Sequence, residues 1–155
     1  MIDSQEIFDP RDEYYMSLAI RQAEEAFDED EVPVGAVVVC NGKIIGTGHN
    51  QTESLNDVTA HAEMIALTAA ANNLGGKYLP QCTIYVTVEP CIMCAGALGW
   101  SQIGRIVYGA SDLKRGFTMF CDHHLSPLHP RTIVTKGVME EEATSLMKDF
   151  FKSKR

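Results

Sequence analysis

Features that mark membrane, secreted and repeat proteins are missing from this sequence of 155 residues. It has no run of eighteen apolar residues, so we expect no membrane-spanning helix. Its first residues, MIDSQEIFDPRDE, are acidic where a secretory signal would be basic, and we therefore expect a cytoplasmic protein. No repeat or low-complexity linker divides the chain, which predicts a single domain over residues 1–155.

An even number of cysteines, typical of a disulfide framework, is also missing. The five cysteines are Cys40, Cys82, Cys91, Cys94 and Cys121. An odd count without a secretion signal indicates thiols that are free or bound to a metal.

Cationic residues are scarce, with 13 Lys and Arg against 21 Asp and Glu and a net charge of −8. They are also unevenly placed, because residues 1–99 carry a net charge of −11 and residues 100–155 carry +3. Such an asymmetry allows a local basic surface for nucleic acid on an acidic protein. A C-terminal helix that is merely solvated would give the same distribution.

Hydrophobic periodicity predicts an alternation of helices and strands. Helices are expected at residues 12–27, 60–73, 91–98 and 140–152, and strands at 34–40, 43–48, 83–88, 105–110 and 132–137. Asn41 and Gly42 predict a two-residue hairpin, Thr59 or Asp57 is expected to cap the second helix, and Pro90 to begin the third. The fold class is therefore α/β, a three-layer α/β/α sandwich with a mixed five-stranded sheet whose later strands are parallel.

Two short motifs carry the chemistry of the sequence. HAEM places His61 and Glu63 at the start of a predicted helix, and EPCIMC places Cys91 and Cys94 at the start of the next. One imidazole and two thiolates are a known ligand set for zinc, and three protein ligands leave the fourth position to water. His61, Cys91 and Cys94 are therefore candidate ligands of a catalytic zinc ion.

Glu63 is the candidate catalytic residue. Because residues i and i+2 of a helix point to different sides, Glu63 need not bind the metal that His61 binds. In the first helical turn it could lie beside a water that the metal activates, and move protons between that water and a leaving group. General acid–base catalysis of this kind contributes roughly 10²- to 10⁴-fold in rate.

Other readings of the cysteines and histidines remain open. A closed structural zinc site would need a fourth protein ligand, for which Cys82, Cys121, His123 and His124 are candidates. A redox Cys-x-x-Cys motif would have no use for Pro90 or for His-x-Glu. The tract CDHH, residues 121–124, is interpreted as surface or substrate loop and is left outside the metal site.

His-x-Glu together with Pro-Cys-x-x-Cys is the signature of the zinc nucleobase deaminases. The chain resembles the cytidine deaminase superfamily, and more narrowly the bacterial tRNA-specific adenosine deaminases. The resemblance covers nearly the whole chain, in the stretches YYMSLAIRQAEEAF, EVPVGAVVV, GHN, TAHAEMIAL, TIYVTVEPCIMCAGAL, QIGRIVYGASDLKRG, GVMEEEA and DFFKSKR.

This resemblance implies a cytidine deaminase-like fold, a homodimer and conversion of the wobble adenosine of a tRNA anticodon to inosine. It implies that His61, Cys91 and Cys94 bind zinc and that Glu63 shuttles protons. It further implies that Asn50 contacts the target base, with the backbone of Ala62 nearby. Asn50 could also end the hairpin as an Asx-turn residue, and the two roles are compatible.

Two segments depart from the pattern of that family, and both would border the substrate. FTMF, residues 117–120, replaces small residues, and LSPLHPRT, residues 125–132, replaces a longer segment with an Asn-His-Arg stretch. Phe117 and Phe120, interleaved with Lys114 and Arg115, could stack on bases or form the core of a small helix. These departures bear on anticodon recognition rather than on deamination.

Two other functions compete with tRNA editing. The same chemistry could deaminate free guanine, cytosine or a nucleoside, and a zinc-stabilised RNA-binding module would need no catalysis. Glu63 argues against the module, because a structural zinc site does not require it. A set of basic residues favours a polynucleotide over a free base: Arg131, Lys136, Lys148, Lys152, Lys154 and Arg155.

Overall fold

The computed structural model describes residues 2–3, 9–122 and 124–155. Its centre is a mixed sheet with the strand order β1-β6-β5-β4-β2-β3. The strands are β1 (Ile2–Asp3), β2 (Gly35–Cys40), β3 (Lys43–His49), β4 (Cys82–Val88), β5 (Arg105–Ala110) and β6 (Ile133–Lys136). The five predicted strands are all present, and the unpredicted two-residue β1 adds a sixth by pairing with β6.

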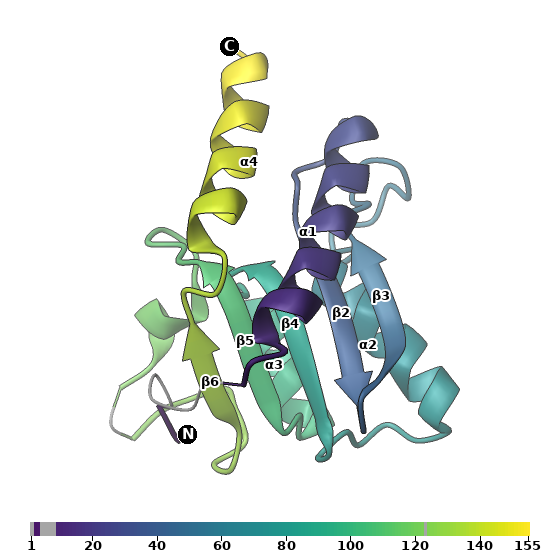
Figure 1. Ribbon diagram of the computed structural model, residues 1–155. Helices are drawn as coiled ribbons and strands as arrows, with labels where there is room; N and C mark the ends of the chain where they lie inside the picture. Colours follow the sequence, from purple (N-terminus) through teal and green to yellow (C-terminus); the bar gives the residue numbers. More distant parts are fainter. Residues whose placement is uncertain (1, 4–8, 123) are drawn as a thin grey trace.

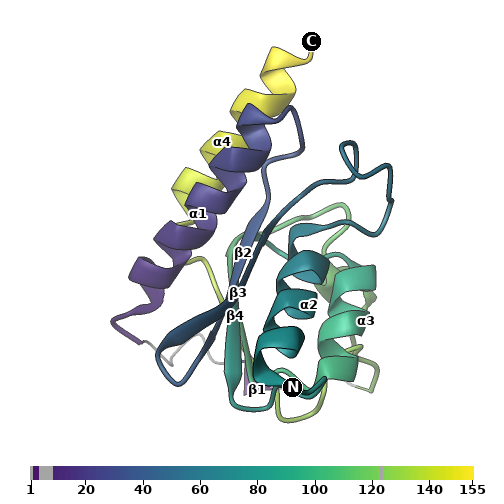
Figure 2. The same cartoon turned by 90° about the vertical axis from the view of Figure 1, so that its right-hand side faces the viewer.

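Helices cover both faces of this sheet, which confirms the predicted three layers (Figures 1 and 2). The helices α1 (Asp12–Asp28) and α4 (Glu140–Ser153) lie on one face, and α2 (Ala62–Leu74) and α3 (Ile92–Ser101) lie on the other. A short 3₁₀ helix, η1 (Phe117–Phe120), follows β5. None of the described helices is long and apolar enough to cross a membrane.

Strand directions bring the two sequence motifs to one edge of the sheet. The β2–β3 hairpin turns at Asn41 and Gly42, both with positive φ, as the Asn-Gly pair predicts. β2 is antiparallel to both β3 and β4, and β4, β5 and β6 are parallel, as predicted. β3 and β4 therefore run in the same direction, and the segments that follow them begin at the same edge.

Close packing of α2 on β3 fixes where α2 begins. A Cβ atom at Gly46 would lie 2.4 Å from the carbonyl oxygen of Ala66, and one at Gly48 would lie 2.5 Å from that of Ala62. The helix therefore rests directly on the strand, with the small residues Ala62, Ala66 and Ala70 fully buried beneath it. This contact places the first turn of α2 at the edge where β4 also ends.

The predicted cap of the second helix is wrong. α2 begins at Ala62 rather than Ala60, and its N-cap residue is His61. Asp57 and Thr59 instead bond to each other, because the backbone N–H and the hydroxyl of Thr59 both donate to Asp57 Oδ1, at 2.8 and 2.7 Å. The Asx-type turn that they form belongs to the loop before the helix.

Candidate active site

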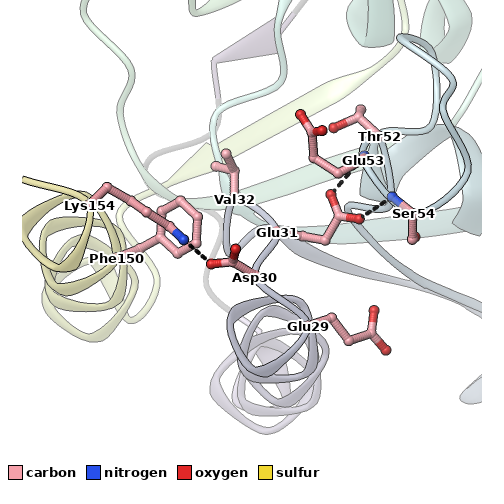
Figure 3. Close-up of a pocket in the computed structure, with 9 residues that line it drawn as sticks. All are labelled: Glu29, Asp30, Glu31, Val32, Thr52, Glu53, Ser54, Phe150 and Lys154. Atoms are coloured by element: carbon pink, nitrogen blue, oxygen red, sulfur yellow. Dashed lines mark hydrogen bonds and ion pairs between the residues drawn. The ribbon is translucent and has the colours of Figure 1, made fainter.

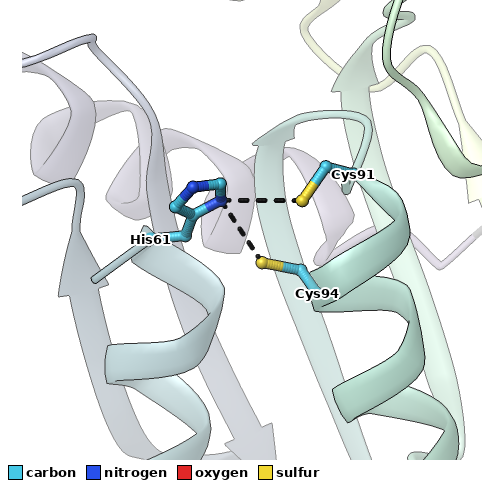
Figure 4. A group of neighbouring side chains, drawn as sticks. All are labelled: His61, Cys91 and Cys94. Atoms are coloured by element: carbon cyan, nitrogen blue, oxygen red, sulfur yellow. Dashed lines mark hydrogen bonds between the residues drawn. The ribbon is translucent and has the colours of Figure 1, made fainter. Parts of the chain in front are cut away.

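Three side chains from two helix starts converge at the edge of the sheet (Figure 4). His61 is the N-cap residue of α2, Cys91 is the N-cap residue of α3, and Cys94 lies in the first turn of α3. His61 Nδ1 lies 3.6 Å from Cys91 Sγ and 3.5 Å from Cys94 Sγ. All three potential ligand atoms lie within 4.8 Å of one another.

These distances fit a tetrahedral zinc ion. Zn–N bonds of about 2.0–2.1 Å and Zn–S bonds of about 2.3 Å at a tetrahedral angle place nitrogen and sulfur about 3.5 Å apart. The two measured N···S distances match this separation. The cluster therefore has the donor set and the spacing for zinc with one further position to fill.

The three ligand residues differ in how easily they lose a proton. Hydrogen bonds from Cys94 and His61 lower the pKa of Cys91 to about 4, against the opposing effect of burial. The hydrogen bond to Cys91, with burial, raises the pKa of Cys94, and contact with Cys91 raises the pKa of His61. Cys91 is therefore the group most easily held as a thiolate, the form that binds metal.

Glu63 lies in the first turn of α2 and is 3 % exposed. Burial raises the pKa of its carboxyl group to about 7, although contacts with His61 and the Cys94 thiol act in the opposite direction. Its carboxylate is not part of the group of three ligand atoms. A carboxyl group of this kind exchanges protons readily at neutral pH, which is the property a proton shuttle needs.

Among the described residues, the cluster contains three ligand residues and no fourth. Cys82 is the first residue of β4 and lies opposite Cys40 of β2 in the sheet, at the end of β4 away from Cys91. The Cys121 thiol donates to the carbonyl oxygen of Phe117 at 3.3 Å, and His124 is exposed. His123, also a candidate fourth ligand, lies outside the described residues. The described geometry favours an open metal site over a closed structural one.

Asn50 and Ala62 lie on either side of the loop that leads to His61. Asn50 follows β3, is 7 % exposed, and its Oδ1 accepts a hydrogen bond from the backbone N–H of Thr52 at 3.3 Å. The Asx-type turn considered for this residue is therefore present. Ala62 is the first residue of α2, where a backbone N–H has no partner within the helix.

Glu31 holds the loop between Asn50 and His61, a role that the sequence analysis missed (Figure 3). Its carboxylate is 1 % exposed and accepts the backbone N–H groups of Glu53 at 3.0 Å and Ser54 at 2.7 Å. Burial alone would raise the pKa of Glu31, but these two bonds outweigh it and lower the pKa below its usual value. The position of this glutamate, in EVPVG directly before a buried strand, could have indicated the role. A carboxylate that is buried beside a strand requires hydrogen-bond partners.

A hollow of about 590 Å³ lies beside Glu31, between the end of α1, residues 52–54 and the end of α4. Its lining includes Glu29, Asp30, Phe150 and Lys154, and Lys154 forms an ion pair with Asp30. None of the metal-cluster residues lines it. Lys154, one of the basic residues that favoured a polynucleotide substrate, is therefore paired with Asp30.

The two phenylalanines of FTMF have different surroundings. Phe117 is fully buried and packs edge-on against Tyr108, with ring centroids 6.4 Å apart. The prediction that Phe117 stacks on bases is wrong, and its alternative as a core residue is confirmed. Phe120 is 51 % exposed and remains a candidate stacking residue beside the exposed Lys114 and Arg115.

Comparison with known proteins supports the interpretation of this cluster as a zinc site. Residues 9–110 match the family described as the cytidine and deoxycytidylate deaminase zinc-binding region, and the chain belongs to this family. The predicted zinc dependence follows from that membership together with the His61, Cys91 and Cys94 cluster.

Within the family, the chain is similar to tRNA-specific adenosine deaminases. It is 43 % identical over 144 residues to the one from Aquifex aeolicus, covering 92 % of this chain and 95 % of that relative. A structure solved in a study of A-to-I editing by tRNA:A34 deaminases is 40 % identical with a TM-score of 0.79, covering 86 % of this chain and 98 % of that one. A guanine deaminase from Bacillus subtilis is 38 % identical with a TM-score of 0.61, covering 64 % of each chain.

Proposed function

We propose that this protein is a zinc-dependent hydrolase that converts the wobble adenosine of a tRNA anticodon to inosine. The observation that carries the proposal is the open three-ligand cluster beside a buried Glu63. It occurs in a chain similar over nine tenths of its length to tRNA-specific adenosine deaminases. Because tRNA is its proposed substrate, we also propose that the protein acts in the cytoplasm.

In this proposal His61, Cys91 and Cys94 hold one zinc ion per chain through Nδ1 and the two Sγ atoms. When bound, zinc supplies a Lewis acid that lowers the pKa of a water molecule to about 7. Since the pKa of the Cys91 thiol is low, this ligand is already a thiolate at neutral pH, whereas Cys94 and His61, whose pKa values are raised, release their protons when the metal binds.

Glu63 moves the protons of the reaction. Hydrolytic deamination forms a bond between water oxygen and adenine C6, and breaks the bond from C6 to the amino group, which leaves as ammonia. Glu63 accepts a proton from the attacking water and gives it to the ring nitrogen next to C6. It then takes the remaining proton from the oxygen now bound to C6 and passes it to the departing amine, so that ammonia leaves and the carbonyl group of inosine forms. A carboxyl pKa of about 7 allows both steps without a large penalty in either direction.

Asn50 and the first turn of α2 would orient the base. The Thr52 contact fixes the amide of Asn50, which offers both a donor and an acceptor to a purine edge. The backbone N–H of Ala62 points from the start of the helix, where donors lack partners and the dipole favours electron-rich atoms.

Exposed side chains support a polyanionic substrate near the cluster, and a second copy of the chain elsewhere on the surface. Lys114 and Arg115 are exposed on the loop beside Cys91, and the exposed Phe120 follows them. Trp100 on α3 is 85 % exposed and Leu113 is 84 % exposed. Large apolar side chains at this exposure favour the homodimer that the family resemblance implies.

Replacing Glu63 with Ala tests the proposed mechanism. We expect zinc content and thermal unfolding close to those of the unmodified chain, and a fall in kcat of at least roughly 10²-fold, because only the proton transfer is removed. Zinc would be measured by elemental analysis and inosine by digestion and chromatography of an anticodon stem-loop. Unchanged turnover would refute the role of Glu63, and loss of zinc would show that it helps to hold the metal.

Deamination of a free base by the same site is the second candidate, supported by the likeness to the Bacillus subtilis guanine deaminase. That likeness covers 64 % of each chain, against more than nine tenths for the tRNA-specific relative. Turnover of free guanine by the purified protein, with an unaltered stem-loop, would favour this candidate.

A further inference from the structure

Glu89 is a buried carboxylate that the proposed chemistry does not use. It lies between β4 and the ligand turn that begins at Cys91, and it is 5 % exposed. Its carboxylate binds the segment 112–118, which is brought there from the end of β5. Oε1 accepts the backbone N–H of Asp112 at 3.1 Å. Oε2 accepts both the backbone N–H of Thr118, at 3.0 Å, and its hydroxyl, at 2.8 Å.

The backbone next to Glu89 reinforces these contacts. The N–H of Phe117 donates to the carbonyl oxygen of Pro90 at 2.9 Å, and Gly116 forms an isolated antiparallel bridge with Cys91. A Cβ atom at Gly116 would lie 2.1 Å from Oε2 of Glu89. Glycine is therefore required here by the approach of the carboxylate, since its φ of −64° suits any residue.

The segment held in this way carries two cations close in sequence to Gly116, which pairs with Cys91. Asp112 Oδ1 accepts the backbone N–H groups of Lys114 and Arg115, each at 3.0 Å, which folds residues 112–115 into a tight turn. Lys114 and Arg115 are both exposed. Glu89 binds this turn at Asp112 and again at Thr118, and it is the one side chain that joins both ends of the segment to the residues before Cys91.

We propose that Glu89 is a positioning residue that sets the 112–118 segment, with Lys114 and Arg115, at a fixed distance from the metal-ligand turn. The phosphates of the substrate strand then bind where the target base reaches the cluster. This inference rests on the proposed action on RNA. Glu89 acts only through the segment, because both of its carboxylate oxygens accept hydrogen bonds from Asp112 and Thr118 and neither belongs to the group of three ligand atoms.

Glu89→Gln is the direct test. It replaces one carboxylate oxygen by an NH₂ group, which cannot accept a hydrogen bond from a backbone N–H. The contact with either Asp112 or Thr118 is therefore lost, while the side chain keeps its size. We expect full zinc occupancy, kcat on an anticodon stem-loop within about threefold of the unmodified chain, and KM raised about tenfold or more. Backbone amides of residues 112–118 should exchange with deuterium at least about tenfold faster, with α1 and α4 unchanged. Glu24→Gln, an exposed carboxylate on α1, is the matched control and should change none of these.

Two further variants guard against a general loss of folding in Glu89→Gln. Thr118→Val removes only the hydroxyl donor of an exposed residue and should raise KM in the same direction by a smaller factor. Gly116→Ala would bring a Cβ atom to 2.1 Å from Glu89 Oε2 and displace the carboxylate, and it should reproduce the rise in KM.

Salt dependence separates positioning from a merely structural role. Each phosphate contact of a single strand contributes about 0.7 to the slope of log affinity against log salt, so losing two contacts flattens the slope by about 1.4. Glu89→Gln should approach the slope of the double variant Lys114→Ala, Arg115→Ala. Adding Glu89→Gln to that double variant should have little further effect, because both changes remove the same interaction.

Additive effects, or a parallel loss of zinc and kcat in Glu89→Gln, would overturn the inference. So would wild-type amide exchange in residues 112–118 together with a wild-type KM. Failure of the proposed function would look different, because the unmodified chain would then leave the stem-loop unaltered while the amide exchange still reported whether Glu89 holds the segment.

Discussion

Asp12 and Arg105 show how a single pair of residues joins helix α1 to the sheet. Arg105 on β5 donates from Nη1 and Nη2 to the two carboxylate oxygens of Asp12 on α1, at 2.8 and 2.7 Å, and Tyr85 donates its hydroxyl to Asp12 Oδ1 at 2.8 Å. Asp12 is 1 % exposed. Burial and the neighbouring Asp12 carboxylate raise the pKa of Tyr85, so its hydroxyl remains a donor.

Asp12→Ala should therefore destabilise the protein strongly. It leaves the partly buried guanidinium of Arg105 without its carboxylate. Breaking a fully buried pair costs about 3–5 kcal/mol in the free energy of unfolding, so we expect a loss of up to about 3 kcal/mol here. Urea denaturation followed by circular dichroism would measure it. Arg11→Ala removes an exposed partner of Asp9 and serves as a control with little expected change. Equal stability of the two variants would contradict this account of the cluster.

At the scale of elements, β3 and α2 place His61 by direct contact. Gly46 and Gly48 are two residues apart on β3, so both face α2. The backbone of α2 occupies the space where a side chain at either position would lie. Shifting this contact would move the N-cap of α2, and with it the imidazole that faces Cys91 and Cys94.

Gly46→Ala should lower both stability and zinc affinity. The added methyl group meets the Ala66 carbonyl oxygen, and overpacking of this kind costs roughly 1–3 kcal/mol. Denaturation and competition for zinc with a chelator would measure the two effects. Gly76→Ala, where nothing lies within 4 Å of the new Cβ atom, is the control. A stable Gly46→Ala variant with unchanged zinc affinity would show that α2 can shift without moving its ligand.

Local signals in the sequence were sufficient for most elements. Asn41 and Gly42 determine the hairpin, and the alternation that follows determines the parallel strands. Caps were less predictable, because Asp57 and Thr59 suit a turn as well as a helix start. The strand β1 was missed, since two residues carry no periodicity.

The ligand set was predictable because both motifs follow strands that run in the same direction. Surroundings that depend on long-range contacts were not predictable. Phe117 resembles a surface aromatic in sequence, yet it packs on Tyr108 from another element. The hydrogen-bond partners of Glu31 and Glu89 lie 22 to 29 residues away in the sequence, and no local pattern predicts contacts at such separations.

At the scale of the whole molecule, α3 carries two of the large apolar side chains that are left exposed. Trp100 is 85 % exposed, and Ile92 on the same helix is 43 % exposed. Ile92 lies at the start of α3 beside Cys91, and Trp100 lies at the other end of the helix, so a second copy of the chain that covered both would lie along the length of α3.

Trp100→Glu should convert the proposed dimer to a monomer, because a carboxylate cannot be buried in an apolar interface without a partner. Sedimentation equilibrium would measure the mass of each species. Tyr14→Glu, an exposed aromatic on α1, is the control and should leave the mass unchanged. A monomeric unmodified chain would contradict the proposed assembly.

The most direct measurement of the proposed function uses the zinc-loaded protein and a set of substrates. An anticodon stem-loop with adenosine at the wobble position is incubated in parallel with free guanine, cytosine and adenosine, and inosine and ammonia are followed. The account predicts inosine at the wobble position and no reaction of the free compounds. Turnover of a free base with an unaltered stem-loop would contradict it and assign the same zinc chemistry to a small substrate.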